Sequence, residues 1–359
     1  MKAKIYDANF LRVDIPDDDK TDWYEVKRGV FDIYGSIPDE ELLTLRMPLD
    51  IAATVNRGTH GQCIYGSGVR MRFSTNSKNL SLKVVYGTGR VPSVCTATLA
   101  FGFDIYSFSE GRETYVTSFV PANDVEDNLN RVYSKRISFT DDERFYTLNF
   151  PHFASVKSML LGVDKGSIIG GGAPYENEEP IVFYGSSITH GASASNPGNT
   201  YQNFIAHKYN YNFYSLGFSG NACGEKTMAE YISHLPMKVF VCDYDHNASS
   251  PEKLRAMHYP FYEVIRKNNP ELPYVMISRP DFFLNPEDSR ARREVILESF
   301  RRAKESGDEN VYFIDGERLF DGEFYHSCTV DGVHPNDIGF MRMGNVIGRL
   351  LHEIIEKSK

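Results

Sequence analysis

The 359-residue sequence lacks several features that would each indicate a class of protein. It has no apolar run of about 18 residues, so no membrane-spanning helix is expected. It has no excess of Lys and Arg. The formal net charge is −9, which disfavours a nucleic-acid surface because phosphate binding requires clustered positive charge. The first residues contain no apolar core of a signal peptide, which predicts a cytoplasmic protein, although a leader removed upstream would leave the same sequence.

Cysteine is scarce and irregularly spaced. The cysteines number five, an odd count, and no C-x-x-C occurs, so the sequence predicts neither a disulfide framework nor a zinc ribbon. The 41% of hydrophobic residues and 24% of charged residues are typical of a soluble globular protein. The length predicts two domains.

The first half of the chain has the alternation expected of strands with one buried face. Apolar residues alternate with polar ones at residues 69–73 and 80–84, and the polar turn at residues 76–79 between them predicts a hairpin. The pattern recurs at residues 99–105 and 146–150. Short strands separated by Gly, Asn and Asp predict an antiparallel β-sandwich.

A change of composition marks the middle of the chain. The stretch GSIIGGGAPYENEE at residues 166–179 is rich in Gly and Glu and predicts a linker. Its three consecutive glycines are not followed by G-K-[ST], so a phosphate-binding loop is disfavoured. The predicted domains are therefore a β-sandwich at residues 1–165 and a second domain at residues 180–359.

Beyond residue 180 apolar runs alternate with helical patterns. The runs are IVFYG, FYSLGFS, KVFVCDYD, YVMISRP and VYFIDG, and such runs are typical of buried parallel strands. Helical periodicity occurs near residues 201–209, 254–265 and 340–354. Five strands separated by helices predict a three-layer α/β domain with a parallel sheet.

Residues that follow these runs are candidates for a site, because ligands bind beyond the carboxyl ends of parallel strands. Ser187 follows the first run, and Asp331 and His334 lie three residues apart around a glycine. A hydroxyl becomes a nucleophile when a base removes its proton, and an imidazole held by a carboxylate is suited to that task. The sequence therefore predicts Ser187 as nucleophile, His334 as base and Asp331 as the residue that orients His334.

An oxyanion site is the other requirement of acyl transfer, since donors must be in position before charge develops. The backbone N–H of Ser187 can supply one donor. The backbone N–H of Gly220 can supply a second, because glycine permits close approach. The side-chain amide of Asn247 can supply a third.

Other interpretations of these residues remain open at this point. A serine after a strand is commonly a helix cap, and Asp331 with His334 could form an ordinary surface loop. Asp243, Asp245 and His246 could bind a metal ion. We favour the alternative in which these three residues shape the loop that presents Asn247.

The ordered motifs resemble the SGNH, or GDSL-like, hydrolase superfamily. They are Gly185-Ser-Ser187-Ile-Thr, Gly217-Phe-Ser-Gly220-Asn, Asn247, and Asp331-Gly-Val-His334-Pro. The four residues that name the superfamily would fall on Ser187, Gly220, Asn247 and His334. Gly102-Phe-Asp-Ile-Tyr106 also resembles the G-x-D-L-Y signature of the β-domain that precedes one subgroup, and residues 337–343 are similar to the C-terminal helix of that subgroup. Ser186 stands where the superfamily usually has Asp.

The resemblance implies a fold. We expect an α/β/α SGNH-type, flavodoxin-like parallel-sheet domain preceded by an antiparallel, jelly-roll-like β-sandwich.

The resemblance also implies a function. We expect a serine esterase that acts on small acyl esters, above all acetyl esters of carbohydrates, with no cofactor and no metal. Its partner would be a soluble oligosaccharide ester, with no nucleic acid or membrane; assembly into a homo-oligomer stays open. The alternatives are a thioesterase or lysophospholipase, a metal-dependent hydrolase, and a carbohydrate-binding protein with little catalysis.

Overall fold

The computed structural model describes residues 12–13, 18–121 and 130–358. Most of the N-terminal segment on which the cytoplasmic prediction rests lies outside these residues. The chain divides into two compact units, each of which is described by itself. Unit 1 comprises Met1–Arg46, Ile64–Tyr175 and Asn196–Gly198, and unit 2 comprises Met47–Cys63, Glu176–Ser195 and Asn199–Lys359. Residues 47–63 therefore belong to unit 2, although their place in the sequence is within the predicted sandwich.

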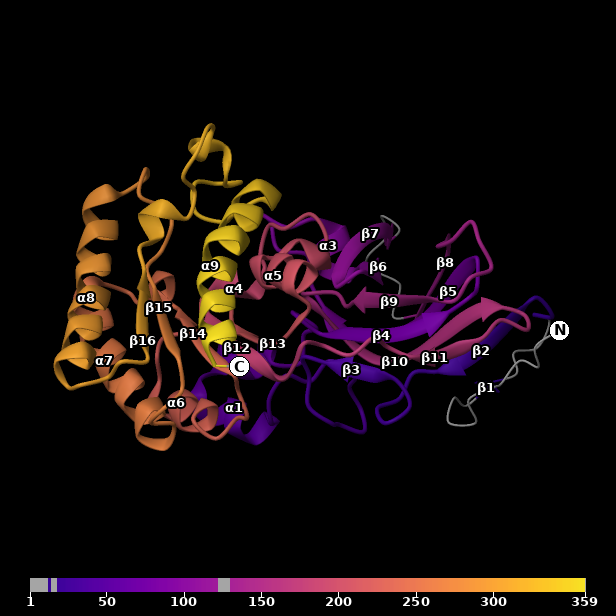
Figure 1. The fold of residues 1–359 in the computed structure, drawn as a ribbon, viewed down its shortest axis with the longest axis horizontal. Helices are drawn as coiled ribbons and strands as arrows, with labels where there is room; N and C mark the ends of the chain where they lie inside the picture. The colour runs from indigo at the N-terminus through magenta and orange to yellow at the C-terminus, as the bar shows by residue number, and fades with distance from the viewer. Residues whose placement is uncertain (1–11, 14–17, 122–129, 359) are drawn as a thin grey trace. The chain divides into compact units, whose positions relative to one another are not determined.

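Unit 1 is an antiparallel β-sandwich, as predicted (Figure 1). One sheet has the order β1-β2-β10-β5-β8, and the other has the order β11-β4-β9-β6-β7 with β3 beside β4. The strands are β1 (Arg12–Val13), β2 (Thr21–Glu25), β3 (Asp32–Tyr34), β4 (Arg70–Thr75), β5 (Asn79–Gly89), β6 (Phe103–Ser109), β7 (Arg112–Phe119), β8 (Asn130–Arg136), β9 (Arg144–Asn149), β10 (Ala154–Asp164) and β11 (Ile169–Gly171), and helix α3 is Ala97–Phe101. Aromatic rings pack between the two sheets. The ring centroid of Phe103 in β6 lies 6.5 Å from that of Tyr86 in β5 and 6.3 Å from that of Tyr133 in β8.

The hairpin predicted at residues 69–84 is wrong. Both strands exist, as β4 and β5, but β4 pairs with β3, β9 and β11, whereas β5 pairs with β8 and β10 in the other sheet. Residues 99–105 are likewise not one strand, because α3 ends at Phe101 before β6 begins. Alternation specifies which face of a strand is buried but not which strand lies beside it.

Unit 2 contains a parallel sheet with the order β13-β12-β14-β15-β16. Its strands are β12 (Asn177–Gly185), β13 (Tyr211–Gly217), β14 (Val239–Asp243), β15 (Tyr274–Ile277) and β16 (Val311–Ile314), so all five predicted strands are confirmed. Its helices are α1 (Leu49–Val55), α2 (Arg57–Gln62), α4 (Ser187–His190), α5 (Tyr201–Tyr209), α6 (Lys226–Ile232), α7 (Pro251–Asn268), α8 (Pro286–Glu305) and α9 (Asp337–Lys357). This is the doubly wound, flavodoxin-like order.

Helices cover both faces of this sheet. The strand order reverses after β13, and right-handed crossovers then place α5 on one face and α6, α7 and α8 on the other. The contacts agree, since α5 packs with α9, while α6 packs with α7 and α7 with α8. No helix in the described part of the chain is both long and apolar enough to cross a membrane.

Three strand ends in unit 2 lie at the same level. Gly185 at the end of β12 pairs in register with Gly217 of β13 and with Asp243 of β14. A Cβ atom on Gly185 would lie closer than 3.0 Å to the Asp243 carbonyl oxygen, and one on Gly217 closer than 3.0 Å to the His190 nitrogen. Glycine at both positions therefore allows the segments that follow the strands to approach one another.

We predict that Gly185→Ala lowers the thermal unfolding midpoint, because the added methyl group collides with main chain that cannot rotate away. The expected cost is about 1–3 kcal/mol, as for overpacked cores. Gly171→Ala is the control, because a Cβ there meets only Asp32 Oδ2, at 3.6 Å. Equal midpoints for the two variants would contradict the prediction.

Candidate active site

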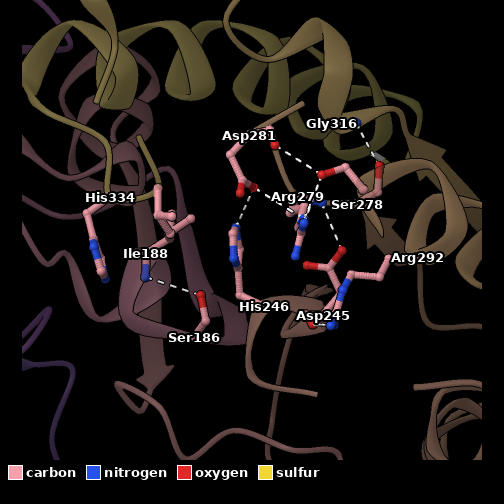
Figure 2. A network of polar contacts seen from close by, with 12 residues as sticks. Ser186, Ile188, Asp245, His246, Ser278, Arg279, Asp281, Arg292, Gly316 and His334 are labelled. Carbon is pink, nitrogen blue, oxygen red and sulfur yellow. Dashed lines mark hydrogen bonds and ion pairs between the residues drawn. The ribbon is translucent and has the colours of Figure 1, made fainter. Parts of the chain in front are cut away.

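The turn after β12 presents Ser187. Ser186, and not Ser187, caps helix α4, because Ser186 Oγ accepts a hydrogen bond from Ile188 N at 3.2 Å (Figure 2). The Ser186 N–H donates to Asp243 O at 3.1 Å. The capping role therefore falls to Ser186, and the hydroxyl of Ser187 is available for another partner.

That partner is His334. Ser187 Oγ lies 2.9 Å from His334 Nε2, and His334 Nδ1 lies 2.8 Å from Asp331 Oδ2. The other carboxylate oxygen of Asp331 accepts the backbone N–H groups of Val333 at 3.0 Å and His334 at 2.8 Å. Gly332 has φ +90°, a left-handed conformation that glycine adopts readily, and this closes the turn.

Asp331 stays ionised in this turn. Its partial burial would by itself raise the pKa of the carboxyl group, but the hydrogen bonds from the His334 backbone and ring and from the Val333 backbone hold the pKa below its usual value. A carboxylate fixed against Nδ1 leaves Nε2 as the proton acceptor of the ring. The arrangement can therefore take a proton from the Ser187 hydroxyl.

Gly220 and Asn247 lie on loops that are tied to each other. The side-chain amide of Asn247 donates to Phe218 O at 3.1 Å, and the Phe218 N–H donates to Gly185 O at 2.9 Å. Gly220 has φ +71°. The structure thus joins Ser187, His334 and Asp331 by direct hydrogen bonds, and it connects Asn247 and the loop of Gly220 to the end of the strand that carries Ser187.

A buried polar network holds the segment that carries Asn247, the short 3-10 helix η3 (Asp245–Asn247) (Figure 2). Asp245 Oδ2 accepts the backbone N–H of Arg279 at 3.0 Å, and Arg292 Nη1 donates to Asp245 O at 2.6 Å and to Ala248 O at 2.9 Å. His246 Nε2 lies 3.0 Å from Asp281 Oδ1. Burial would lower the pKa of His246, but the neighbouring Asp281 raises it above its usual value.

Sequence reasoning missed the partners in this network: Arg279, Asp281 and Arg292. Arg279 and Asp281 follow strand β15 in ISRPD, and that position at a carboxyl end could have indicated them. Arg292 lies within helix α8, where nothing in the sequence distinguishes it from other arginines. Residues 18–121 and 130–358 contain no group of three or more His, Cys, Asp or Glu side chains that could hold a metal ion.

Asp243 lies beside the turn of Ser187 and is buried. Its Oδ2 accepts hydrogen bonds from Thr189 Oγ1 at 3.2 Å and from Tyr201 OH at 3.4 Å. Burial, followed by the charge of Asp245, raises the pKa of Asp243 to about 8. The side chain is therefore largely protonated at neutral pH.

Comparison with known proteins places the chain in a family. Residues 178–352 match the GDSL-like lipase/acylhydrolase family, and residues 21–169 match GxDLY, the N-terminal domain of SGNH hydrolase-type esterases. The chain belongs to the SGNH, or GDSL-like, hydrolase superfamily, in the subgroup with a GxDLY domain, and the predicted resemblance is confirmed. This membership supports an esterase activity.

Solved structures share the whole fold. A GDSL-like lipase from Bacteroides ovatus is 26% identical, with a TM-score of 0.83 over 93% of this chain and 98% of its own. The salicylyl-acyltransferase of a tetracycline biosynthetic pathway is 18% identical, with a TM-score of 0.71 over 97% and 98%. An acetyl xylan esterase from Butyrivibrio proteoclasticus is 12% identical, with a TM-score of 0.56 over 94% and 99%. Among curated protein sequences there is no match.

We predict that Asp243→Asn stabilises the protein increasingly as pH rises from about 4 to about 8. Over this range the unfolded carboxyl group loses its proton while the folded one keeps it, so the wild type loses stability that the uncharged amide retains. The measurement is the difference in unfolding midpoint between variant and wild type as a function of pH.

Asp288→Asn is the control for this experiment. Partial burial would raise the pKa of Asp288, but Arg292 and Arg279 lower it, so the wild-type carboxylate contributes stability that is lost on acidification. Because the pKa of Asp288 is lowered from its usual value of 3.8, the difference for Asp288→Asn should change only on acidification below about pH 4, and it should stay flat from about pH 4 to about 8, where the difference for Asp243→Asn rises. A pH-independent difference for Asp243→Asn would refute the assignment.

Proposed function

We propose that this protein is a serine esterase that hydrolyses small acyl esters, acetyl esters of carbohydrates in particular, through an acyl-enzyme on Ser187. The observation that carries the proposal is the chain of hydrogen bonds from Ser187 Oγ to His334 at 2.9 Å and from His334 to Asp331 at 2.8 Å. In this chain the serine hydroxyl can act as nucleophile, the imidazole as base and the carboxylate as the group that orients the imidazole.

In the proposed reaction, Ser187 Oγ attacks the ester carbonyl as His334 Nε2 takes the serine proton. The tetrahedral intermediate collapses when His334 returns that proton to the leaving alcohol. Water then attacks the acyl-enzyme by the same route, with His334 again as base. Asp331 holds the ring and stabilises the imidazolium, and the chemistry uses no cofactor.

The proposed oxyanion donors are the N–H groups of Ser187 and Gly220 and the side-chain amide of Asn247. The Asn247 amide has two hydrogens, and one of them serves the Phe218 carbonyl, so the other is available to a substrate oxygen. Such donors act without reorganisation because the protein fixes them in advance.

A pocket beside the catalytic turn supports a carbohydrate as the alcohol part of the substrate. Its volume is about 340 Å³, and its lining is largely aromatic: Pro280, Phe282, Phe283, Glu317, Phe320, Asp321 and Tyr325. We call it the aromatic pocket. Leu284, next in sequence to its wall, packs on the Asp331–His334 turn, because a Cβ on Gly332 would lie closer than 3.0 Å to the Leu284 side chain.

The residues of the aromatic pocket suit a sugar ring. Tyr325 is 53% exposed, and an exposed aromatic ring can stack on the apolar face of a sugar. Asp321 is exposed and can accept hydrogen bonds from sugar hydroxyls. The same fold in an acetyl xylan esterase makes acetylated xylo-oligosaccharides the first substrates to test.

We predict that Ser187→Ala lowers kcat for acetate release by about 10³-fold or more, with the fold retained. The assay measures acetate released from acetylated xylo-oligosaccharides, with long-chain esters, lysophospholipid and an acyl thioester for comparison. A chelator leaves the wild-type rate unchanged, because the mechanism uses no metal. Full activity in Ser187→Ala would reject the mechanism, and a preference for thioester or lysophospholipid would favour the alternative substrates.

We predict that Tyr325→Ala raises KM for acetylated oligosaccharides by about tenfold, since an aromatic contact contributes about 0.5–1.5 kcal/mol. KM for ethyl acetate, which has no ring to stack, should be unchanged. Phe139→Ala is the control, because Phe139 is 84% exposed but belongs to unit 1. Equal changes for both substrates would count against the aromatic pocket as the sugar site.

A further inference from the structure

Residues 47–63 form two short helices, α1 and α2, whose packing partners lie far away in the sequence. In the sequence they separate strands β3 and β4 of the sandwich, yet they belong to unit 2. Helix α1 packs against α6, which follows the loop of Gly220. The family motifs do not include this segment, and the proposed mechanism does not use it.

Side chains of α2 and its cap bind the carbonyl groups around Gly220. Gln62 Nε2 donates to Ser219 O at 2.9 Å, and Gln62 is only 7% exposed. Asn56 Nδ2 donates to Asn221 O at 2.9 Å, while Asn56 Oδ1 accepts the Thr59 N–H at 2.8 Å and so caps α2. The helix and the loop are therefore joined on both sides of Gly220.

The bond from Gln62 bears directly on the proposed oxyanion donor. Ser219 O and the N–H of Gly220 belong to one planar trans peptide, so they point in opposite directions. A donor that fixes the oxygen also fixes the direction of the N–H. It polarises the same peptide as well, which makes that N–H a stronger donor.

This peptide is the central one of a turn that the Asn221 N–H closes by donating to Phe218 O at 2.9 Å, and that bond allows either orientation of the peptide. Gly220 is exposed and has φ +71°, and glycine populates positive and negative φ about equally. The second donor to Ser219 O is the side chain of Asn221, at 2.6 Å. That side chain in turn lies against Gly58 of α2, where a Cβ would approach it closer than 3.0 Å. Helix α2 therefore controls both donors.

We infer that Gln62 is a positioning residue for catalysis, which aims the Gly220 N–H at the oxyanion by holding the Ser219 carbonyl. The inference rests on the proposed function. Gln62 touches no reacting atom, so its removal should weaken transition-state binding and leave ground-state binding intact. That selective loss of transition-state binding distinguishes Gln62 from a residue that only stabilises the fold.

The first test is Gln62→Met, which keeps the length of the side chain and removes the donor. We expect kcat on an activated acetyl ester to fall about tenfold or more, with KM unchanged within about twofold. Loss of an oxyanion donor itself costs about 10²–10³-fold, and here Asn221 still holds the carbonyl, so a smaller loss is expected. Thr54→Val is the control, because Thr54 in α1 is exposed and bonds only within its helix, to Ile51 O at 2.7 Å.

Methylboronic acid provides a readout that a purely structural role would not move. Its boron forms a bond to Ser187 Oγ as the serine proton passes to His334, and the tetrahedral anion that results places an oxygen in the oxyanion site. Its affinity should fall in Gln62→Met by about the same factor as kcat. Unchanged affinity, or an effect on KM alone, would overturn the inference.

A pair of variants in α2 covers the case in which Gln62→Met does not fold. Gly58→Ala pushes against the Asn221 side chain, whereas a Cβ on Gly61 meets no atom within 4 Å. We expect Gly58→Ala to lose kcat and boronate affinity together and Gly61→Ala to keep both. Ser187→Ala separates the two hypotheses. If it is inactive while Gln62→Met and Gly58→Ala keep full kcat, the inference fails and the esterase stands; if it is active, the esterase itself fails.

Discussion

The close approach of three strand ends is the constraint on which the candidate site depends. The main chain at Ser186 donates to Asp243 O, and the main chain at Phe218 donates to Gly185 O, so the segments after β12, β13 and β14 bond to one another directly. These bonds require the strand ends to approach one another more closely than residues with side chains would allow. Glycine at 185 and 217 meets that requirement. The glycines of the motifs are thus structural, and the polar residues beside them supply the chemistry.

Much of unit 2 could be predicted because its signals are local. Continuous apolar runs such as IVFYG identify buried parallel strands, and their ends identify the edge at which polar residues gather. The turn from Asp331 to His334 is also local, since three residues and one glycine bring carboxylate and ring together. The contact between Ser187 and His334, in contrast, joins residues far apart in the sequence and depends on how the sheet places its strand ends. Only the order of the motifs indicated that contact.

Non-local pairing could not be predicted in the same way. Alternation at residues 69–84 identified two strands and their buried faces, but their partners lie in different sheets. Residues 47–63 carry no long periodic pattern, because α1 and α2 are too short to have one. Their place in unit 2 follows from side chains such as Asn56 and Gln62, which bond to carbonyl groups some 160 residues away. No feature of the local sequence specifies such partners.

The charges around Asn247 balance among themselves, and this bears on the metal-binding alternative. A cluster of carboxylates attracts a cation when it has no positive neighbour, but here Arg279 forms ion pairs with both Asp281 and Asp288, and His246 lies 3.0 Å from Asp281. Asp243 reduces the negative charge further by remaining largely protonated at neutral pH. The hydrogen bonds of this network end on main-chain groups of residues 245–248, so the network fixes the conformation of that loop. A buried ion-pair network adds little net stability because desolvation offsets the attraction of its charges, so its effect here is to define the loop conformation.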